Sequence, residues 1–306
     1  MEIDNEKLFK INESDDIVYT TNYAVMFYFD NNQYFFKEDN GFGSLVETEL
    51  LASKIGQKLG VDTVEVKPAV FCAPSVDREI VGVFAKNFHK DDVAVNFNNE
   101  IREFLVKNNY DSVVKAVKKY INDTKIKQDI DIKLEPKFYQ KLLDMIFFDF
   151  VTLQADRHEG NYEFLLKKVG NCWQLGLAPI FDNSWIFGIQ EVNRTYVQKS
   201  NIQDYIKGVH RYIFGFKQCQ KYENIKNDIL YLCRHSDRYR MLAKRVLDID
   251  VLECIDELEN ENPGIVFDEG IKNVAKYCWQ IVQNDLKNSL QSDLQVEDNP
   301  SKDCSF

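Results

Sequence analysis

Over roughly the first 90 residues, short runs of β-branched and aromatic residues alternate with turn residues, a pattern typical of an antiparallel sheet. The pair Asn31-Asn32 between two of these runs is typical of a hairpin turn. The first third of the chain is therefore predicted to be a small β-rich unit. Its expected strands cover residues 17–21, 24–29, 34–37, 64–71 and 80–85.

A helical period replaces the strand pattern near residue 90. Before that point, one helix is expected over residues 44–59, ended by Gly60. Beyond it, a hairpin over residues 162–167 and 173–177 interrupts the helices. The expected helices cover residues 99–120, 135–153 and the stretch from about 224, including 264–290. The predicted fold class is α+β, with a β-rich unit at 1–87, a helical unit at 88–290 and a disordered tail at 291–306.

Length and charge limit the classes of protein that fit. A chain of 306 residues is long enough for two packed units with separate cores. The formal net charge of −11 argues against direct nucleic-acid binding, which needs clustered Lys and Arg. The longest apolar run, residues 145–153, contains Asp149 and is too short to span a bilayer. We therefore expect no membrane span and no direct nucleic-acid partner.

The cysteines and the first residues bear on location. The seven cysteines are scattered and form no CxxC pair, so reduced thiols are expected. The first residues include neither a basic region nor an apolar one, so a secretory signal is not expected. These features predict a cytoplasmic protein, and they are equally compatible with a translocated effector that lacks a classical signal peptide.

Candidate chemistry is concentrated in one stretch of the predicted helical unit. Asp156 is followed by Asn161 five residues later, and Asp182 follows beyond the predicted hairpin in the sequence Ala178-Pro179-Ile180-Phe181-Asp182. A metal bound to phosphate takes oxygen ligands, and an attacking hydroxyl needs a proton acceptor. Two acids and an amide at this spacing therefore predict an ATP-dependent phosphotransferase.

The motif Asp156-Arg157-His158-x-x-Asn161, followed by Ala-Pro-x-Phe-Asp182, resembles the HipA-like serine/threonine kinases. Within that group the chain looks most like the short kinases exemplified by a translocated kinase of Helicobacter. The resemblance implies a bilobal protein-kinase-like fold of the phosphatidylinositol-kinase type. It also implies that Asp156 accepts the substrate proton and that Asn161 and Asp182 bind the Mg²⁺ of ATP.

The same resemblance extends to the β-rich unit. Lys37 ends a predicted strand, and the following helix carries Glu49-x-x-Ala52 before Leu59-Gly60. Lys37 is implied to contact the ATP phosphates, and Glu49 to hold it by an ion pair. Glu47 competes for this pairing, but two residues turn a helix by about 200°, so only one of the two can face the sheet. Glu49 is preferred because its spacing matches the family.

Further site residues are assigned by position. Val83, Phe84 and Ala85 lie where the units join and are expected to enclose the adenine ring. His158 is placed in the nucleotide-binding loop, with a packing and hydrogen-bonding role. Arg157 either orients Asp156 or contacts phosphate, and the sequence does not choose between them.

One feature departs from the usual kinase pattern. Residues 12–22, where a glycine-rich turn would cover the phosphates, contain no glycine and three acids. Three functions therefore remain open: a serine/threonine protein kinase that also phosphorylates itself, a phosphoinositide or small-molecule kinase, and a nucleotide-binding pseudokinase or scaffold. For the first, the expected partners are a protein substrate with a Ser or Thr hydroxyl and an antitoxin-like or host protein.

Overall fold

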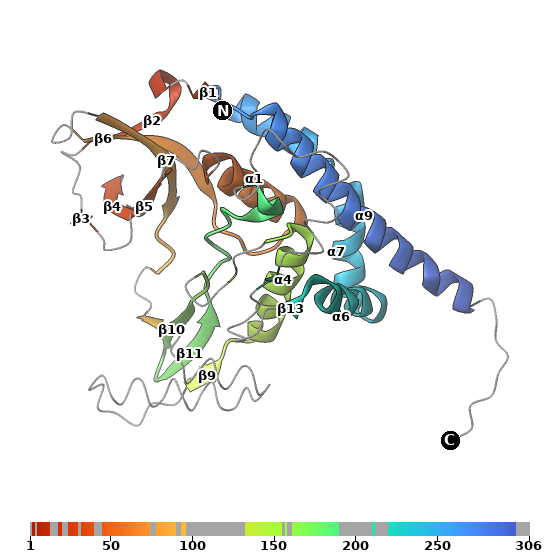
Figure 1. The fold of residues 1–306 in the computed structure, drawn as a ribbon. Coiled ribbons are helices and arrows are strands. Elements are labelled where there is room, and N and C mark those ends of the chain that lie inside the picture. Colours follow the sequence, from red (N-terminus) through yellow and green to blue (C-terminus); the bar gives the residue numbers. More distant parts are fainter. Residues whose placement is uncertain are drawn as a thin grey trace.

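The structure is a computed structural model. It describes residues 2–3, 5–12, 18–19, 24–29, 32–39, 45–73, 78–89, 93–95, 132–154, 157, 161–189, 210–211 and 220–297. A curled β-sheet forms one end of the molecule, and a group of helices forms the other (Figure 1). The predicted helix over residues 99–120 lies outside the described residues. No helix within the described ranges is both long and apolar enough to cross a membrane.

The curled sheet has six strands in the order β2-β6-β7-β5-β4-β3. The five predicted strands are confirmed, but β2 was not predicted, because its alternating Phe-Lys-Ile-Asn pattern is only four residues long. This strand pairs parallel with β6, so the sheet is not wholly antiparallel as predicted. The strands are β2 (Phe9–Asn12), β3 (Val18–Tyr19), β4 (Ala24–Phe29), β5 (Asn32–Glu38), β6 (Val66–Ala73) and β7 (Arg78–Lys86).

The two faces of this sheet have different neighbours. Residues directly opposite each other on paired strands share a face, and side chains alternate along each strand. Lys37 of β5 pairs with Val83 of β7, and this face packs against helix α1 (Leu45–Leu59). Phe36 pairs with Phe84, and that face forms a separate aromatic cluster inside the curl. The sheet therefore presents Lys37 and Phe84 on opposite sides.

Helix α1 ends as predicted, at Gly60. Gly60 adopts a φ of 72°, the left-handed conformation that glycine accepts without a Cβ clash. Its N–H donates to the carbonyl of Gln57, and the N–H of Val61 donates to that of Gly56, at 3.1 and 3.0 Å. These two bonds form a Schellman motif. They stop the helix where the chain turns toward the sheet again.

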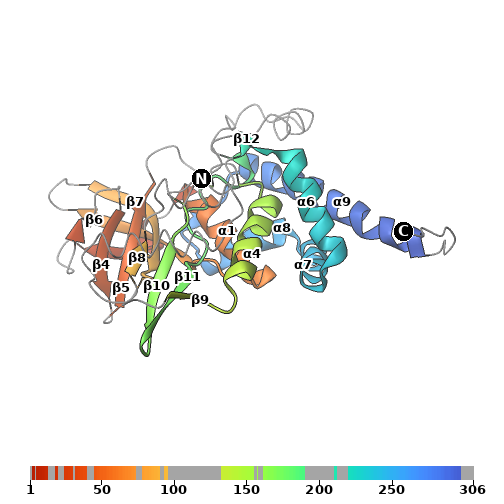
Figure 2. The ribbon, with the colours of Figure 1, turned by 90° about the horizontal axis from the view of Figure 1, so that it is seen from below.

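A second, four-stranded sheet lies between the curled sheet and helix α4 (Phe138–Val151), as Figure 2 shows. Its central strands form the predicted hairpin, which turns at Gly170 with a φ of 60°. Strand β11 also pairs parallel with β9. The strands are β8 (Val93–Val95), β9 (Ile132–Leu134), β10 (Phe164–Val169) and β11 (Cys172–Leu177).

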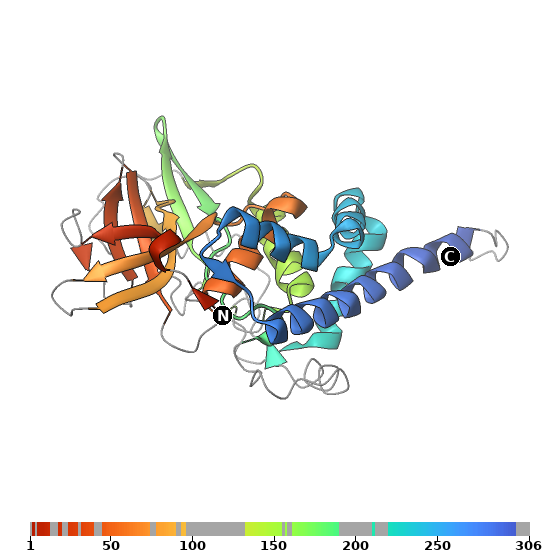
Figure 3. The ribbon, with the colours of Figure 1, turned by 90° about the horizontal axis from the view of Figure 1, so that it is seen from above.

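Further helices among the described residues pack against α1, against α4 or against one another. They are α6 (Tyr222–His235), α7 (Asp237–Asp248), α8 (Val251–Glu261) and α9 (Glu269–Glu297). The helix predicted over residues 264–290 begins only at Glu269, because residues 265–266 instead form β14 (Ile265–Val266), which pairs with β1 (Glu2–Ile3). Helix α9 continues to Glu297, into the predicted tail, and its far end projects from the helical group (Figure 3). Residues 298–306 lie outside the described part.

Helices α7 and α8 contact α1 on the side away from the curled sheet. Lys54 and Lys58 of α1 contact Glu257 of α8 at 2.9 and 2.7 Å, and Lys54 also contacts Glu261 at 2.6 Å. Arg245 of α7 donates to the carbonyl of Leu59 at 2.6 Å. Helix α1 is therefore bound on one side by the sheet and on the other by the carboxyl-terminal helices.

Candidate active site

An ion pair joins the sheet to helix α1. The Nζ atom of Lys37 on β5 lies 3.0 Å from Oε1 of Glu49 on α1. Glu49 is only 4 % exposed, and the backbone N–H of Asn183 donates to both of its carboxylate oxygens at 3.1 Å. The contact of Lys37 is thus with Glu49, the glutamate that the resemblance favoured over Glu47. Because Asn183 follows Asp182, the carboxylate also joins α1 to the segment that carries the predicted metal ligand.

Asp182 meets the same lysine. Lys37 Nζ donates to Asp182 Oδ1, which also accepts from the hydroxyl of Ser184 at 3.4 Å. The side-chain amide of Gln154 donates to the backbone carbonyl of Asp182 at 3.2 Å. Asp182 adopts a φ of 54°, a left-handed conformation in which aspartate is among the more tolerated residues. Such backbone conformations persist where surrounding contacts hold them, and they concentrate at functional sites.

Lys37 stays charged in this environment. Burial acts to lower the pKa of its ammonium group, but the charges of Glu49 and Asp182 and the hydrogen bonds to them act in the opposite direction and outweigh it. The net effect raises the pKa above the ordinary value for lysine. A protonated Lys37 is therefore available over the whole physiological pH range as a fixed positive charge.

Arg157 connects the two loops that carry the predicted metal ligands. Its side chain is 1 % exposed, and its Nη1 donates to the carbonyl of Asn161 at 2.7 Å and to that of Phe181 at 2.6 Å. Its Nε lies 3.1 Å from Oδ2 of Asp149 on α4, and Nη2 donates to Oδ1 of Asn183 at 2.7 Å. We call this set the Arg157 clasp.

The clasp argues against one of the two roles left open for Arg157, the contact with phosphate. A buried guanidinium that donates to two carbonyls, a carboxylate and an amide is not available to a phosphate. Its contacts instead hold Asn161 and the segment Phe181–Asn183 beside each other. Asn161 itself is 4 % exposed. The structure thus brings Lys37, Glu49 and Asp182 into direct contact, and it joins Asn161 to them through Arg157.

Two predicted residues, Asp156 and His158, lie outside the described residues. Their assigned roles, as proton acceptor and as part of the nucleotide-binding loop, therefore stay predictions. Their neighbours Arg157 and Asn161 are described and are held by the clasp. The positions of Arg157 and Asn161 are therefore set by buried hydrogen bonds.

The predicted adenine pocket needs one correction. Val83 and Ala85 share the Lys37 face of the sheet, as expected for residues near a bound nucleotide. Phe84 lies on the other face, where its ring centroid is 5.0 Å from that of Phe9 and 5.7 Å from that of Tyr34. Side chains alternate along a strand, so three consecutive residues cannot enclose one ring from the same side. The ring of Phe84 is not part of the pocket.

The segment after β7 is tied to both sheets. The N–H of Asn87 donates to the carbonyl of Gln33 at 2.8 Å, which holds the segment to β5. His89 Nε2 shares a hydrogen bond of 2.5 Å with Glu163 just before β10. The ring of Phe88 lies 5.5 Å from that of Phe181. The connection between the predicted units therefore contacts the segment that leads to Asp182.

Sequence reasoning missed two residues of the clasp, Asp149 and Asn183. Asp149 interrupts an otherwise apolar helix, and charged side chains are almost never fully buried unless they are paired. That exception to the apolar pattern was a usable signal for a buried partner. Asn183 offered no comparable signal, because its role depends on two residues distant in sequence, Glu49 and Arg157.

The donor atoms of the site suit a hard divalent cation. Asn161 and Asp182 offer amide and carboxylate oxygens, the ligand types that Mg²⁺ uses together with phosphate oxygens and water. Within the described ranges, no group of three or more His, Cys, Asp or Glu residues could hold a metal by itself. A site with few protein ligands fits a cation that arrives with phosphates, and it does not fit a structural zinc site.

The comparisons with known proteins bear on the fold. No protein-family model matches the chain, and no curated protein sequence matches it. Among solved structures, the chain is similar to the Helicobacter pylori proinflammatory kinase CtkA, with a TM-score of 0.57 and 18 % identity, over 94 % of this chain and 99 % of that chain. The chain therefore shares the fold of this kinase. The α+β, bilobal kinase-like prediction is thereby confirmed.

Two further structures are more distantly similar. HipA of Shewanella oneidensis MR-1, solved with HipB and operator DNA, has a TM-score of 0.41 and 10 % identity, over 94 % of this chain and 65 % of that chain. The choline kinase LicA of Streptococcus pneumoniae has a TM-score of 0.23 and 11 % identity, over 90 % and 92 %. These similarities are too low to carry an argument about this chain.

Proposed function

We propose that the protein is an ATP-dependent phosphotransferase that transfers the γ-phosphate of Mg-ATP to a Ser or Thr hydroxyl of a protein, including its own. The observation that carries this proposal is the contact of Lys37 with both Glu49 and Asp182. It unites a strand lysine, a helix glutamate and a loop aspartate in a fold that is also that of a kinase. Positioned charges of this kind supply most of the catalysis in phosphate transfer.

Each residue of the site has a distinct role in this proposal. Lys37 neutralises the phosphates, and Glu49 keeps its ammonium group in place. Asn161 and Asp182 would hold the magnesium, which when bound neutralises charge between the β- and γ-phosphates. Asp156 orients the substrate hydroxyl and accepts its proton. The Arg157 clasp holds the backbone of Asn161 beside the segment Phe181–Asn183, and so positions the two metal ligands relative to each other.

We place the adenine ring against the Lys37 face of β7, beside Val83 and Ala85. The backbone after β7, up to Asn87, would bind the edge of the base. In this proposal the nucleotide-binding lobe comprises residues 1–87 and the catalytic lobe residues 88–290. The hydrogen bonds of Asn87 to Gln33 and of His89 to Glu163 support a connection of defined geometry between them.

The test is a transfer assay with γ-³²P-labelled ATP and Mg²⁺, comparing the wild type with Asp182→Asn. The substitution keeps the shape of the side chain but removes the charge that holds metal, so we expect transfer to fall by about 10² to 10³ or more. Asp256→Asn, which changes an exposed aspartate of α8, is the matched control and should transfer at the wild-type rate. Circular dichroism checks that all three proteins are folded.

The same assay distinguishes the substrate classes. Parallel reactions contain a general protein substrate, phosphatidylinositol vesicles or choline, and mass spectrometry locates the label. Phosphate on Ser or Thr of protein supports the proposal. Label found only on lipid or choline would contradict the protein substrate, and equal labelling by wild type and Asp182→Asn would contradict the assigned site.

A further inference from the structure

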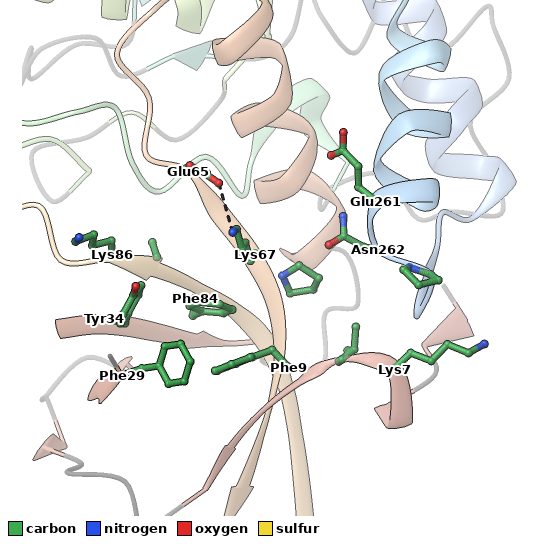
Figure 4. A pocket seen from close by; sticks show the side chains of 14 residues that line it. Lys7, Phe9, Phe29, Tyr34, Glu65, Lys67, Phe84, Lys86, Glu261 and Asn262 are labelled. Carbon is green, nitrogen blue, oxygen red and sulfur yellow. Dashed lines mark ion pairs between the residues drawn. The ribbon is translucent and has the colours of Figure 1, made fainter. Parts of the chain in front are cut away.

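A groove lies on the face of the curled sheet opposite to Lys37. It has a volume of about 440 Å³ and runs between strands β2, β5, β6 and β7 and the end of helix α8. Figure 4 shows its aromatic floor and the lysines around it. We call it the aromatic groove, and its lining includes Lys7, Phe9, Phe29, Tyr34, Glu65, Lys67, Pro68, Phe84, Ala85, Lys86 and the segment Glu261–Pro263.

The floor of the aromatic groove is a set of packed rings that opens to solvent. The centroid of Phe9 lies 5.1 Å from that of Phe29 and 5.0 Å from that of Phe84. Tyr34 lies 5.7 Å from Phe84, so the four rings are contiguous. Phe29 is 50 % exposed. Packed rings that remain accessible offer a preformed apolar surface to another molecule.

A second hollow continues the groove along the back of α1. It has a volume of about 380 Å³ and shares Glu65, Lys67, Glu261 and Asn262 with the aromatic groove. It reaches Leu50, Ser53 and Lys54 of α1. The two adjoining hollows form a path that extends from the rings to the helix that carries Glu49.

The charge of this path is opposite to that of the whole chain. Among the described residues, its lining includes four lysines and two glutamates, and no aspartate or arginine. Both glutamates have lysine neighbours, since Glu65 lies 3.7 Å from Lys67 and Glu261 lies 2.6 Å from Lys54. The formal net charge of the chain is −11. A local excess of positive charge therefore favours an acidic ligand.

The backbone at the groove disfavours strand addition. Strand β2 pairs with Ala69–Cys72 of β6, so it does not cover the first residues of that strand. There Pro68 has no N–H to offer, and the N–H of Val66 already donates to Ser53 Oγ at 3.4 Å. At this edge few N–H groups are available to an added strand, so the rings and the lysines are the groups that an extended ligand would contact.

We propose that the aromatic groove binds an acidic segment of another protein, which places one aromatic or large aliphatic side chain on the rings and its carboxylates near Lys67 and Lys86. The proposal goes beyond phosphate transfer, because the groove and Lys37 occupy opposite faces of the sheet. Exposed charge pairs each contribute little and are screened by salt, so the affinity is moderate and falls as the salt concentration rises.

Fluorescence anisotropy with labelled peptides and the purified full chain tests the proposal directly and needs no catalysis. The probe is a short peptide of alternating Glu and Asp around a central Phe-Leu pair. One comparison peptide has Ala in place of Phe-Leu, and another has Lys in place of the acids. We expect saturable binding of the first peptide, weakened by salt, and binding at least about tenfold weaker for the other two.

Matched variants locate the binding site. Lys67→Glu with Lys86→Glu reverses two charges at the groove, and Lys167→Glu with Lys168→Glu makes the same change on exposed positions of β10. Phe29→Ser removes an exposed ring, and Met241→Ala removes a similarly exposed apolar side chain on α7. We expect about a tenfold or greater loss of affinity for the groove variants and less than about twofold for the controls.

Three outcomes would overturn the proposal. The acidic peptide could fail to bind saturably, the comparison peptides could bind equally well, or the groove variants could bind as tightly as their controls. Analytical ultracentrifugation of the chain alone tests whether the groove is instead occupied by a second copy of the chain. If the groove variants alter self-association and leave peptide affinity unchanged, the groove accommodates a second copy of this chain instead.

Discussion

Helix α4 carries two buried aspartates, and each forms an ion pair with a different arginine. One pair lies at the candidate site, and the other joins two helices away from it. Asp144 and Asp149 are five residues apart, so they point about 140° apart around the helix. Asp149 faces the active site, where its Oδ1 lies 2.9 Å from Nη2 of Arg157. Asp144 faces α7, where its Oδ2 lies 2.5 Å from Nη2 of Arg238. Both are aspartate–arginine ion pairs on the same helix, but the residues around them differ.

The two arginines differ in the contacts that they make besides the aspartate. Arg157 also donates to carbonyls of the two loops that carry Asn161 and Asp182. Arg238 has a side chain that is 36 % exposed, and Asp144 takes a further hydrogen bond from Tyr239 at 3.1 Å. One pair therefore positions segments of the site, and the other fastens one helix to another. A buried ion pair alone does not indicate a functional site.

The largest expected effect comes from breaking the buried pair at the site. Arg157→Met leaves the carboxylate of Asp149 buried without its arginine, so the free energy of unfolding should fall by about 3 to 5 kcal/mol. The milder Arg157→Lys keeps a positive charge but loses the fork that reaches both loops. We expect this variant to fold and to need more Mg²⁺ for half-maximal transfer. Urea unfolding and Mg²⁺ titration of the transfer rate measure the two effects.

Arg238→Lys is the control for this prediction, because it changes the other pair in the same way. Its Mg²⁺ dependence should match that of the wild type. If both lysine variants shift the Mg²⁺ requirement equally, the distinction between a positioning pair and a fastening pair is wrong.

The next effect concerns Glu49, which joins the two sides of the site. Glu49→Gln keeps the size of the side chain but removes the charge that holds Lys37, so we expect kcat/KM to fall by about 10². Glu47→Gln, on the same helix, should lower the activity of the folded protein by less than about threefold. Single-turnover transfer at saturating ATP measures both variants. Equal losses would mean that the glutamates act only through the stability of α1.

A smaller effect is expected from breaking the fastening pair outright. Arg238→Ala removes a partly exposed ion pair and leaves Asp144 with the hydroxyl of Tyr239, so the free energy of unfolding should fall by about 1 to 2 kcal/mol. Transfer by the folded protein should stay within about twofold of the wild type. Thermal denaturation and the transfer assay measure this pair of quantities. A large loss of activity at an unchanged melting temperature would contradict the comparison.

The smallest expected effect is a difference between the alkylation rates of cysteines in the helices and on the second sheet. Burial raises the pKa of Cys233 to about 12 and that of Cys254 to about 11. Near pH 8 both are therefore protonated in the folded protein, and we expect slow alkylation by iodoacetamide. Cys172, which is partly exposed on β11, should react faster. Mass spectrometry of a labelling time course measures these rates.

The labelling rate of Cys233 should also depend on pH and on the ion pair between Asp144 and Arg238. A thiol whose folded pKa is raised contributes stability that is complete below the unfolded value of about 8.5 and declines as the pH rises above it. Labelling of Cys233 should therefore accelerate above that pH. It should also be faster in Arg238→Ala, because α7 is then held less firmly against α4. Equal labelling of Cys172 and Cys233 in the wild type would contradict the packing of α6.

Local patterns in the sequence predicted much of the fold. Helix α1 and its end at Gly60 were predicted because helical period and left-handed glycine are properties of neighbouring residues. The β10–β11 hairpin and five strands of the curled sheet were predicted for the same reason. Strand β2 was missed because a short strand is defined by the partner it pairs with, and here the partner, β6, is distant in sequence.

Some residues of the candidate site were also predicted from the sequence, and others were not. The resemblance carried by the motifs was enough to select Lys37, Glu49, Asn161 and Asp182. In the structure Lys37 contacts Glu49 and Asp182, and Arg157 contacts the backbone carbonyl of Asn161. The clasp itself was not predictable, because its donors and acceptors come from segments on both sides of the hairpin. The side of the sheet on which Phe84 lies was overlooked, although strand alternation already excluded it from a pocket shared with Val83 and Ala85.

The sequence by itself thus determined which chemical groups are present and which local elements carry them, because spacing and periodicity act over a few residues. Only the tertiary structure decided what those groups face. It placed Arg157 in a buried network rather than at a phosphate, and it put an aromatic groove behind the strand that carries Lys37. Burial and long-range hydrogen bonding depend on segments that meet only after folding, and no local pattern encodes their distances.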